Sequence, residues 1–270
     1  MNTQGKIIVV TGAGNGMGRE ITLHLVRDKG ARVAAVDMSE SALQETVRLA
    51  GENGTAISSH RVDITDKASV DELPALVQAT HGAVDGIINN AGIIQPFVKL
   101  NELPFDAIER VMNVNFYGTM YMIKAFLPHL LQRPEAHIVN ISSMGGFLPV
   151  PGQTVYGASK AAVKLLTEGL HSELQGTSVG VTVVFPGAIG TNIAQNSGVA
   201  GTLKVDESKA QSFPTLPPSE AAKIIIRAME QNRYRVTVGK DARFMDIIYR
   251  LHPERAARFI FRQMQALLAK

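Results

Sequence analysis

Short apolar runs rich in β-branched side chains recur along the chain and alternate with longer stretches of helical periodicity. Five such runs predict buried strands of a parallel sheet, at 7–10, 32–36, 84–88, 137–141 and 179–185. Long helical patterns lie near 105–131 and 155–174. Because strands and helices alternate, we predict a doubly wound α/β fold with helices on both faces of the sheet. The 270 residues suffice for one sizeable core, and nothing divides them into two independent domains.

The segment from residue 241 onward carries two amphipathic stripes. The first consists of Phe244, Ile247, Ile248 and Leu251, and the second, after His252-Pro253, of Ala257, Ile260, Phe261, Met264, Leu267 and Leu268. We predict two helices with a break at the proline, as a helical extension (241–270) of a main domain (1–240). Their apolar faces fit packing on the chain itself or on a second subunit. The neighbouring arginines leave open a peripheral membrane contact, which the pattern favours less.

A glycine-rich turn follows the first predicted strand directly. It reads Thr11-Gly12-Ala13-Gly14-Asn15-Gly16-Met17-Gly18 and opens a helical pattern. Glycines let a backbone approach a pyrophosphate, and a helix N-terminus offers free N–H groups and a positive dipole end. The spacing is G-x-x-x-G-x-G rather than the commoner G-x-G-x-x-G. The turn is therefore a candidate phosphate-binding loop for a dinucleotide.

An acidic residue, Asp37, ends the second predicted strand, nineteen residues after Gly18. A carboxylate at this place accepts hydrogen bonds from an adenosine ribose and repels a 2′-phosphate. No basic residue stands at Met38, and Asn15 adds no charge to the loop. This favours NAD(H) over NADP(H). The alternative role for Asp37 is to cap the helix that begins near Ser39.

Tyr156 and Lys160 lie four residues apart, and Ser143 precedes the tyrosine by thirteen. On a helix, positions i and i+4 share one face, so the ammonium can lie beside the phenol. A free tyrosine has a pKa of about 10, and a nearby cation favours the phenolate. Ser143 could hold an oxygen that Tyr156 protonates or deprotonates. The set predicts a proton-transfer site for an alcohol or a carbonyl.

Together these segments resemble the short-chain dehydrogenase/reductase family, in its single-domain branch, from about residue 6 to residue 239. The resemblance implies a Rossmann-type sheet of about seven strands. It also implies a catalytic tetrad of Asn115, Ser143, Tyr156 and Lys160. In that tetrad Asn115 supports a proton-relay water, and Lys160 both lowers the pKa of Tyr156 and binds the nicotinamide ribose.

The resemblance further implies where a cofactor is held. Asp63, expected at the end of the third strand, would contact adenine, and Pro186-Gly187 with Thr191 would lie over the nicotinamide. The full set of expected cofactor contacts is Gly12, Asn15, Gly16, Met17, Gly18, Asp37, Met38, Asp63, Ile64, Asn90, Ala91, Gly92, Tyr156, Lys160, Pro186, Gly187, Ile189 and Thr191.

We therefore expect an oxidoreductase that moves a hydride between NAD(H) and a hydrophobic secondary alcohol or ketone. Tyr156, as phenolate, would take the hydroxyl proton while Ser143 positions the substrate oxygen. Two alternatives stay open: an NADPH-dependent carbonyl reductase, and a non-catalytic NAD-binding sensor or scaffold.

The substrate side is predicted less sharply. Residues 190–216 are rich in Gly, Ser, Asn and Thr, which suits a lid over the substrate or a surface loop. The expected pocket walls are mostly apolar: Ile94, Gln95, Gly145 to Leu148, Val150, Pro151 and Ile189. This composition favours a substrate with a hydrophobic body.

Bulk properties exclude several classes of site. The chain has no cysteine, which excludes disulfides and thiolate chemistry and fits a cytoplasmic protein. The seven histidines show no metal-ligand spacing, and the formal charge of +3 lacks the basic patches of nucleic-acid binding. No leader or membrane-spanning segment is expected. A homo-dimer or homo-tetramer is implied by resemblance, through the helices near 105–131 and 155–174.

Overall fold

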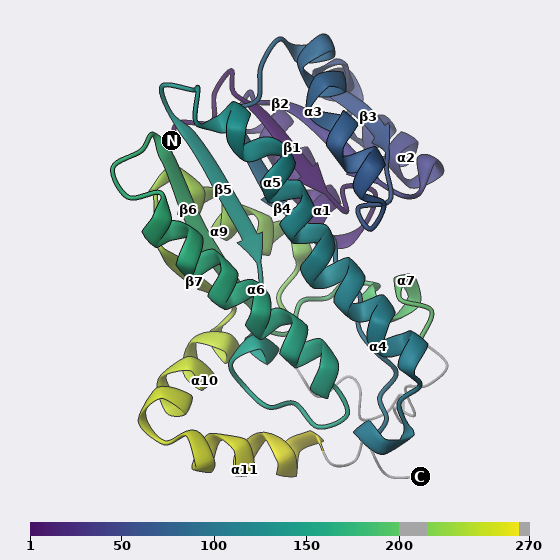
Figure 1. Cartoon of the computed structure of the whole chain (residues 1–270), viewed down its shortest axis with the longest axis vertical. Coiled ribbons are helices and arrows are strands. Elements are labelled where there is room, and N and C mark those ends of the chain that lie inside the picture. Colours follow the sequence, from purple (N-terminus) through teal and green to yellow (C-terminus); the bar gives the residue numbers. More distant parts are fainter. Residues whose placement is uncertain (200–214, 265–270) are drawn as a thin grey trace.

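Seven strands form one fully parallel sheet in the order β3-β2-β1-β4-β5-β6-β7 (Figure 1). The computed structural model describes residues 1–199 and 215–264. The strands are β1 (Ile7–Thr11), β2 (Arg32–Asp37), β3 (Ile57–Arg61), β4 (Gly86–Asn89), β5 (Ala136–Ile141), β6 (Val179–Pro186) and β7 (Arg235–Val238). The five predicted apolar runs all become strands. The doubly wound parallel fold is thus confirmed.

Burial explains why the central strands read as continuous apolar runs. Every residue of β1, β4 and β5 is buried, because helices cover both faces of the sheet. The two edge strands differ, since β3 and β7 are only partly buried and β3 contains Ser58, Ser59 and His60. Edge strands tolerate polar residues because one side of each lacks a neighbouring strand.

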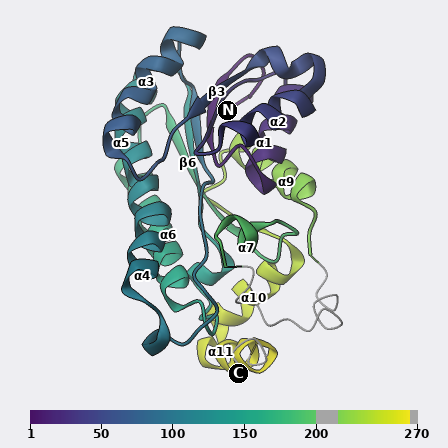
Figure 2. The same ribbon diagram turned by 90° about the vertical axis from the view of Figure 1, so that its right-hand side faces the viewer.

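Two helical layers enclose the sheet (Figure 2). On one face α1 (Gly16–Arg27), α2 (Glu40–Ala50) and α9 (Pro218–Glu230) share an apolar core that includes Ile21, Leu43 and Ile225. On the other face α3 (Lys67–His81), α5 (Thr119–Leu130) and α6 (Thr154–Glu173) share a second core built around Phe126 and Leu73. The sheet is the wall between the two cores.

The single helix expected near 105–131 is interrupted. It consists of α4 (Phe105–Met112), the π-helical segment η3 (Asn113–Gly118) and α5. Short π-helical segments inside helices often occur at functional sites. The remaining short elements are the 3₁₀ turns η1 (Gly51–Ala56), η2 (Leu100–Glu102) and η4 (Met144–Gly146), and the helical turn α7 (Ile193–Asn196).

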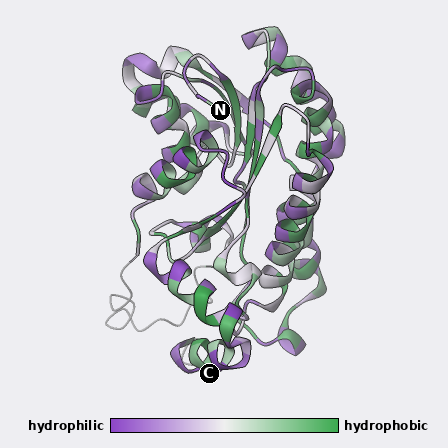
Figure 3. Ribbon diagram, turned by 90° about the vertical axis from the view of Figure 1, so that its left-hand side faces the viewer, coloured by the Kyte–Doolittle hydropathy of each residue, from purple (hydrophilic) through white to green (hydrophobic). Residues whose placement is uncertain are grey.

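The C-terminal segment forms α10 (Lys240–Leu251) and α11 (Pro253–Met264), with the predicted break at Pro253. Both helices lie at one end of the molecule, where hydrophobic and hydrophilic residues mix along them (Figure 3). Met245, Ala256 and Ile260 pack on Leu148, in the segment that follows β5. Leu267 and Leu268, which the second stripe included, lie outside the described residues.

The connection pattern creates a crevice at one end of the sheet. From β1 the chain proceeds to β2 and β3 on one side, and it then crosses to β4 on the other side of β1. In parallel sheets, ligands bind outside the carboxyl ends of the strands at such a switch point. The glycine-rich turn follows β1, and Asn90 follows β4, so both border this crevice.

Candidate active site at the carboxyl edge of the sheet

Two glycines of the turn after β1 are required by close packing. Gly12 has a φ of +66°, and a Cβ there would lie 2.9 Å from Nδ2 of Asn90. A Cβ on Gly18 would lie only 2.1 Å from the carbonyl oxygen of Gly12. The turn folds tightly because neither residue carries a side chain.

Asn90 and Thr11 tie the ends of β1 and β4 together. The Thr11 hydroxyl oxygen accepts hydrogen bonds from the backbone N–H groups of Asn90 and Ala91, both at 3.0 Å. The Asn90 amide donates to the carbonyl oxygen of Thr11 at 3.1 Å. Asn90 therefore supports the glycine-rich turn, because these bonds fix the end of β1 against the residues that follow β4.

The N-terminus of α1 fits a pyrophosphate. Asn15 caps the helix, and its side-chain oxygen accepts from the N–H of Gly16. Within the described residues, the N–H groups of Met17 and Gly18 have no hydrogen-bond acceptor, and the first turn carries no acidic side chain. Free N–H groups at the positive end of a helix dipole are suited to bind phosphate oxygens.

The Asp37 carboxylate accepts two backbone hydrogen bonds that connect the glycine-rich turn to the residue before α2. Its Oδ2 accepts from the N–H of Gly14 at 3.0 Å, and its Oδ1 accepts from the N–H of Ser39 at 3.0 Å. Ser39 in turn caps α2. Met38 is 70 % exposed and uncharged, so position 38 places no basic side chain beside the Asp37 carboxylate. The carboxylate is thus fixed between the glycine-rich turn and the start of α2, and its contact with a ribose stays a prediction.

Arg19 is a neighbour of this position that the sequence analysis missed. Its guanidinium donates to the carbonyl oxygen of Gly14 and, at 3.2 Å, to the hydroxyl of Thr46. The sequence prediction considered only position 38 and the glycine-rich turn for a basic side chain, whereas Arg19 comes directly after that turn. A cation therefore lies against the same loop that Asp37 contacts.

The predicted adenine side needs one correction. Strand β3 ends at Arg61, so Asp63 lies two residues beyond the strand and not at its end. Asp63 is exposed, and its carboxylate accepts from the N–H and the hydroxyl of Thr65. The Ile64 side chain is buried against Gly118, so only its backbone could face a cofactor.

Ser143 and Tyr156 come together although they lie on different elements. Ser143 caps η4 just after β5, and its hydroxyl oxygen accepts from the N–H of Gly145 at 3.0 Å. Tyr156 lies in the first turn of α6. A Cβ on Gly145 would be 3.4 Å from the Tyr156 ring and 3.5 Å from the Ser143 hydroxyl oxygen. The glycine keeps the space between these two groups free of a side chain.

Burial sets the protonation of the pair on α6. It raises the pKa of Tyr156 above its ordinary value, and interaction with the Ser143 hydroxyl offsets this in part. Burial also lowers the pKa of Lys160 to about 8. The sequence predicted that Lys160 lowers the pKa of Tyr156. In the protein without a bound cofactor, the pKa of Tyr156 is raised instead. The Lys160 ammonium donates to the carbonyl oxygen of Ile141 at 2.9 Å.

Asn115 lies in the π-helical segment η3 and is fully buried. Its amide accepts from the N–H of Ile93 at 2.9 Å and donates to the Ile93 carbonyl oxygen at 3.0 Å and to the Ser159 hydroxyl at 2.9 Å. A Cβ on Gly92 would lie 3.2 Å from the Asn115 oxygen and 3.1 Å from the Lys160 nitrogen. Asn115 and Lys160 thus meet at Gly92, beside the end of β4.

The segment after β6 lies near the glycine-rich turn. A Cβ on Gly16 would lie 3.4 Å from the Thr191 side chain. Ile189 bridges to Leu216 and packs on the core of the α1 face. Thr191 therefore lies beside the glycine-rich turn, while Pro186 ends β6 and Gly187 follows it. Their predicted contact with a nicotinamide stays a prediction.

Asp241, which the sequence analysis did not select, holds this segment from the C-terminal side. Its carboxylate accepts from the N–H of Ala188 at 2.6 Å. A Cβ on Gly187 would lie 2.2 Å from one carboxylate oxygen, and a Cβ on Gly239 would lie 2.3 Å from the other. Two glycines therefore make room for this carboxylate.

Gln95, expected as a pocket wall, has a different position. Its side chain is fully buried and donates to the Gly152 carbonyl oxygen at 3.0 Å. Its oxygen accepts from the N–H groups of Val155 and Tyr156. Leu148 is likewise buried, in the contact with α10 and α11. Most of the expected lid (residues 200–214) lies outside the described residues.

Two kinds of feature are not found in the parts that the structure describes. Residues 1–199 and 215–264 hold no cluster of three or more His, Asp or Glu side chains that could bind a metal ion. In the same ranges, no helix combines the length and apolarity needed to cross a membrane.

Known proteins resemble this chain over nearly its whole length. SadH, a protein of Mycobacterium tuberculosis (strain H37Rv) that is named as an oxidoreductase, is 38 % identical over 258 residues, which cover 92 % of this chain and 91 % of SadH. A short-chain dehydrogenase/reductase from Burkholderia phymatum, solved in complex with NAD, superimposes with a TM-score of 0.82 at 27 % identity and covers 93 % of this chain and 96 % of its own.

A second solved structure gives the same picture with the other nicotinamide cofactor. A short-chain dehydrogenase from Burkholderia cenocepacia J2315, in complex with NADP, has a TM-score of 0.80 at 26 % identity and covers 96 % of this chain and 99 % of its own. The short chain dehydrogenase family model matches residues 6–200, which include the glycine-rich turn, Asn115, Ser143, Tyr156 and Lys160. The chain therefore belongs to the short-chain dehydrogenase family.

Proposed function

We propose that this protein is an NAD(H)-dependent oxidoreductase that interconverts hydrophobic secondary alcohols and ketones. The observation that carries the proposal is the meeting of Ser143 and Tyr156 across Gly145, with the Lys160 ammonium on the same helix. Further support comes from the glycine-rich turn, which offers free N–H groups at the N-terminus of α1. A bound nicotinamide supplies or accepts the hydride.

The remaining steps belong to side chains of this chain. In the oxidation direction, Tyr156 as phenolate would take the proton from the substrate hydroxyl. Ser143 donates a hydrogen bond to the substrate oxygen and holds it beside the phenol. Because burial alone raises the pKa of Tyr156, the phenolate needs a cation, which Lys160 can supply when protonated.

Asn115 acts as a positioning residue in this scheme. Its amide is fully used by Ile93 and Ser159, so it fixes the loop after β4 to the helix that bears Tyr156 and Lys160. The proposed relay water would then be held near Asn115 by a backbone group. The carbonyl oxygen of Asn115 accepts from the Thr119 hydroxyl, and a carbonyl oxygen carries two lone pairs.

NAD is the favoured cofactor because the Asp37 carboxylate, which accepts from the N–H of Gly14 in the glycine-rich turn, would repel a 2′-phosphate. Arg19 is the one observation that favours NADP instead, since its guanidinium contacts the same loop. The similar solved structures include complexes with either cofactor. Comparing kcat/KM for the two cofactors decides between them, and Arg19→Met should lower the NADP value more than the NAD value.

The test of the proposal is oxidation of graded hydrophobic secondary alcohols with NAD, including cyclic and steroid-like ones. The expected result is that turnover disappears in Tyr156→Phe while the variant still binds NADH, as measured by the change in NADH fluorescence. Substantial activity in Tyr156→Phe would mean that another group is the base. NAD binding without turnover of any alcohol would favour the sensor or scaffold alternative.

A further inference from the structure

The positive charge of this protein is concentrated in its last two described helices. The chain carries 27 Lys and Arg against 24 Asp and Glu. Residues 240–264 hold six of those basic residues and three of the acidic ones, which leaves 21 of each in the rest of the chain. The formal net charge of +3 therefore equals the excess on α10 and α11.

Helix α10 carries apolar side chains on its inner side and also on its outer side. Its inner side is buried through Ala242 and Met245. Phe244, Ile247 and Leu251 lie on the opposite side and are 55 %, 52 % and 69 % exposed. The predicted stripe is thus divided, with Ile248 packed inward and these three side chains facing solvent. Packing against the described residues, 1–199 and 215–264, does not account for their exposure.

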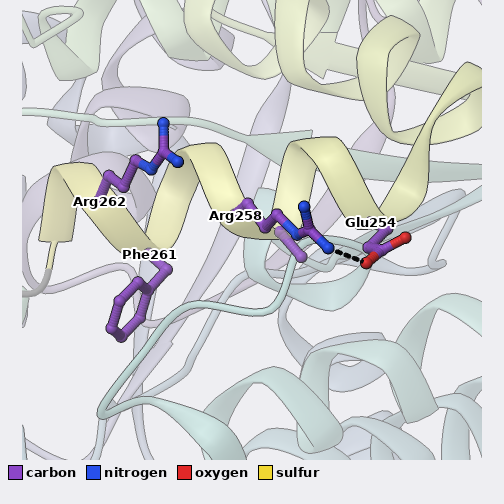
Figure 4. A pocket seen from close by; sticks show the side chains of 5 residues that line it. Glu254, Arg258, Phe261 and Arg262 are labelled. Atoms are coloured by element: carbon purple, nitrogen blue, oxygen red, sulfur yellow. Dashed lines mark hydrogen bonds and ion pairs between the residues drawn. The ribbon is translucent and has the colours of Figure 1, made fainter.

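Helix α11 adds arginines and aromatic rings to the same end of the molecule. Ala256 and Ile260 face inward, whereas Phe259 and Phe261 are 45 % and 51 % exposed. Arg258 is turned toward Glu254, and Arg262 extends away from both (Figure 4). An open hollow of about 650 Å³ is lined by Glu254, Ala257, Arg258, Phe261 and Arg262.

The carboxylates near this face are already used. Asp246 pairs with Arg235 at 2.9 Å and with Arg250 at 3.2 Å, and Glu254 pairs with Arg258. Within residues 1–199 and 215–264, Arg243, Arg255 and Arg262 have no ion-pair partner. The unpaired charge on this face is therefore positive, so its occupant must be negative.

A second copy of the chain fits this face poorly, because a two-fold contact would bring like charges together. Exposed Phe, Ile and Leu side chains beside arginines match an anionic lipid surface, where apolar groups enter the acyl boundary and guanidinium groups contact lipid phosphates. We propose that α10 and α11 form a docking surface for anionic lipid bilayers.

Docking would also orient the candidate active site. The inner faces of α10 and α11 pack on Leu148 and contact Met144, and Met144 follows Ser143 directly. A bilayer bound at the outer faces would be separated from the segment that carries Ser143 only by these two helices. A lipid-bound protein could take hydrophobic alcohols directly from the membrane. This consequence rests on the proposed function, whereas the docking itself does not.

The experiment is sedimentation of the full chain with vesicles of phosphatidylcholine alone or of phosphatidylcholine with phosphatidylserine. Binding only to the anionic vesicles, weakened by added salt, is expected. An apolar variant (Phe244→Ser, Ile247→Ser, Leu251→Ser) and a charge variant (Arg243→Gln, Arg255→Gln, Arg262→Gln) should each bind on the order of tenfold or more weakly.

Phe105→Ser with Leu76→Ser provides the matched control, because these side chains are 81 % and 51 % exposed on other helices. The control should bind vesicles like the parent, and unchanged thermal melting shows that each variant is folded. Equal binding to neutral and anionic vesicles, no binding, or unchanged binding by both variants would overturn the proposal. A subunit contact would instead be shown by an apolar variant that changes the oligomeric state of a parent that binds no vesicles.

Discussion

The side-chain oxygen of Gln95 accepts the backbone N–H of Tyr156 at 2.9 Å, so a residue after β4 caps the helix that carries the candidate base. The same oxygen accepts from Val155 at 2.8 Å. Gln153, at the start of α6, makes no capping bond with its own side chain. The distant glutamine thus satisfies two of the free N–H groups that a helix leaves at its N-terminus. The position of the Tyr156 backbone depends on Gln95.

Gln95→Leu should therefore impair turnover more than cofactor binding. The change leaves two buried N–H groups and the Gly152 carbonyl oxygen without partners, which should lower the free energy of unfolding by about 2–4 kcal/mol. With Tyr156 less well fixed, we expect kcat to fall about tenfold or more. Kinetics and NADH titration at a temperature where the variant remains folded measure both effects.

Gln95→Glu is the conservative comparison for this prediction. It keeps the acceptor for Val155 and Tyr156, and a negative charge at a helix N-terminus is favourable. It should recover most of kcat even though the bond to Gly152 is lost. Equal kcat in Gln95→Leu and the parent would show that the cap serves stability alone.

Asp241 should influence the cofactor through the segment after β6. Asp241→Ala removes the acceptor for the Ala188 N–H and leaves a gap between Gly187 and Gly239. We expect the KM for the cofactor to rise about five- to tenfold, corresponding to about 1–1.4 kcal/mol, with a smaller change in kcat. Asp241→Asn retains an acceptor oxygen and should lie between the parent and the alanine variant. Cofactor KM values equal in all three proteins would contradict this role.

The sequence predicted those parts of the fold and site whose signals are local. Buried parallel strands are continuous apolar runs, and the glycine-rich turn, Asp37 and the Tyr156–Lys160 pair are each set within a few residues. Strand β3 has no comparable signal, because it is an edge strand with the sequence Ile-Ser-Ser-His-Arg. The π-helical turn at 113–118 likewise has no periodicity that separates it from α4 and α5.

The roles of Gln95 and Asp241 could not be predicted because they depend on distant contacts. Gln95 bonds to a backbone group 61 positions away, and Asp241 to one 53 positions away. Which backbone groups these side chains meet is decided only when the sheet and the C-terminal helices are assembled. The only signal in the sequence was the pair of glycines, Gly187 and Gly239, which both make room for the Asp241 carboxylate.

His137 should make the folded protein sensitive to acid. Burial, with a smaller contribution from the positive N-terminus, lowers the pKa of His137 to about 3 from 6.5. Its ring bonds to the Thr182 hydroxyl at 2.8 Å, and that hydroxyl donates to the Arg233 carbonyl oxygen. The unfolded chain therefore binds a proton at His137 more readily than the folded protein does. The stabilisation is complete above pH 6.5 and is lost as the pH falls from 6.5 toward 3.

His137→Gln isolates this contribution, because the other titrating groups remain. Between pH 6 and pH 4 the parent should lose about 1.4 kcal/mol more unfolding free energy per pH unit than the variant. Urea unfolding of both proteins across that range provides the measurement. Parallel pH profiles would mean that His137 titrates normally in the folded state.

Lys160 is expected to cost stability in the protein without cofactor. Burial lowers its pKa from 10.5 to about 8, so the folded state releases this proton more readily than the unfolded chain does. The associated stabilisation is complete above pH 10.5 and is lost as the pH falls from 10.5 to 8. Below pH 8 the buried ammonium has one acceptor among the described residues, the carbonyl oxygen of Ile141.

Lys160→Met should therefore unfold at a higher urea concentration than the parent at pH 7, with a gain on the order of 1–2 kcal/mol after the lost hydrogen bond is subtracted. The gain should shrink as the pH rises toward 10, while turnover is lost at every pH. Lys124→Met, a change on the exposed side of α5, is the control for a general effect of removing a lysine. A variant that is less stable than the parent at pH 7 would show that the ammonium stabilises this crevice even without a cofactor.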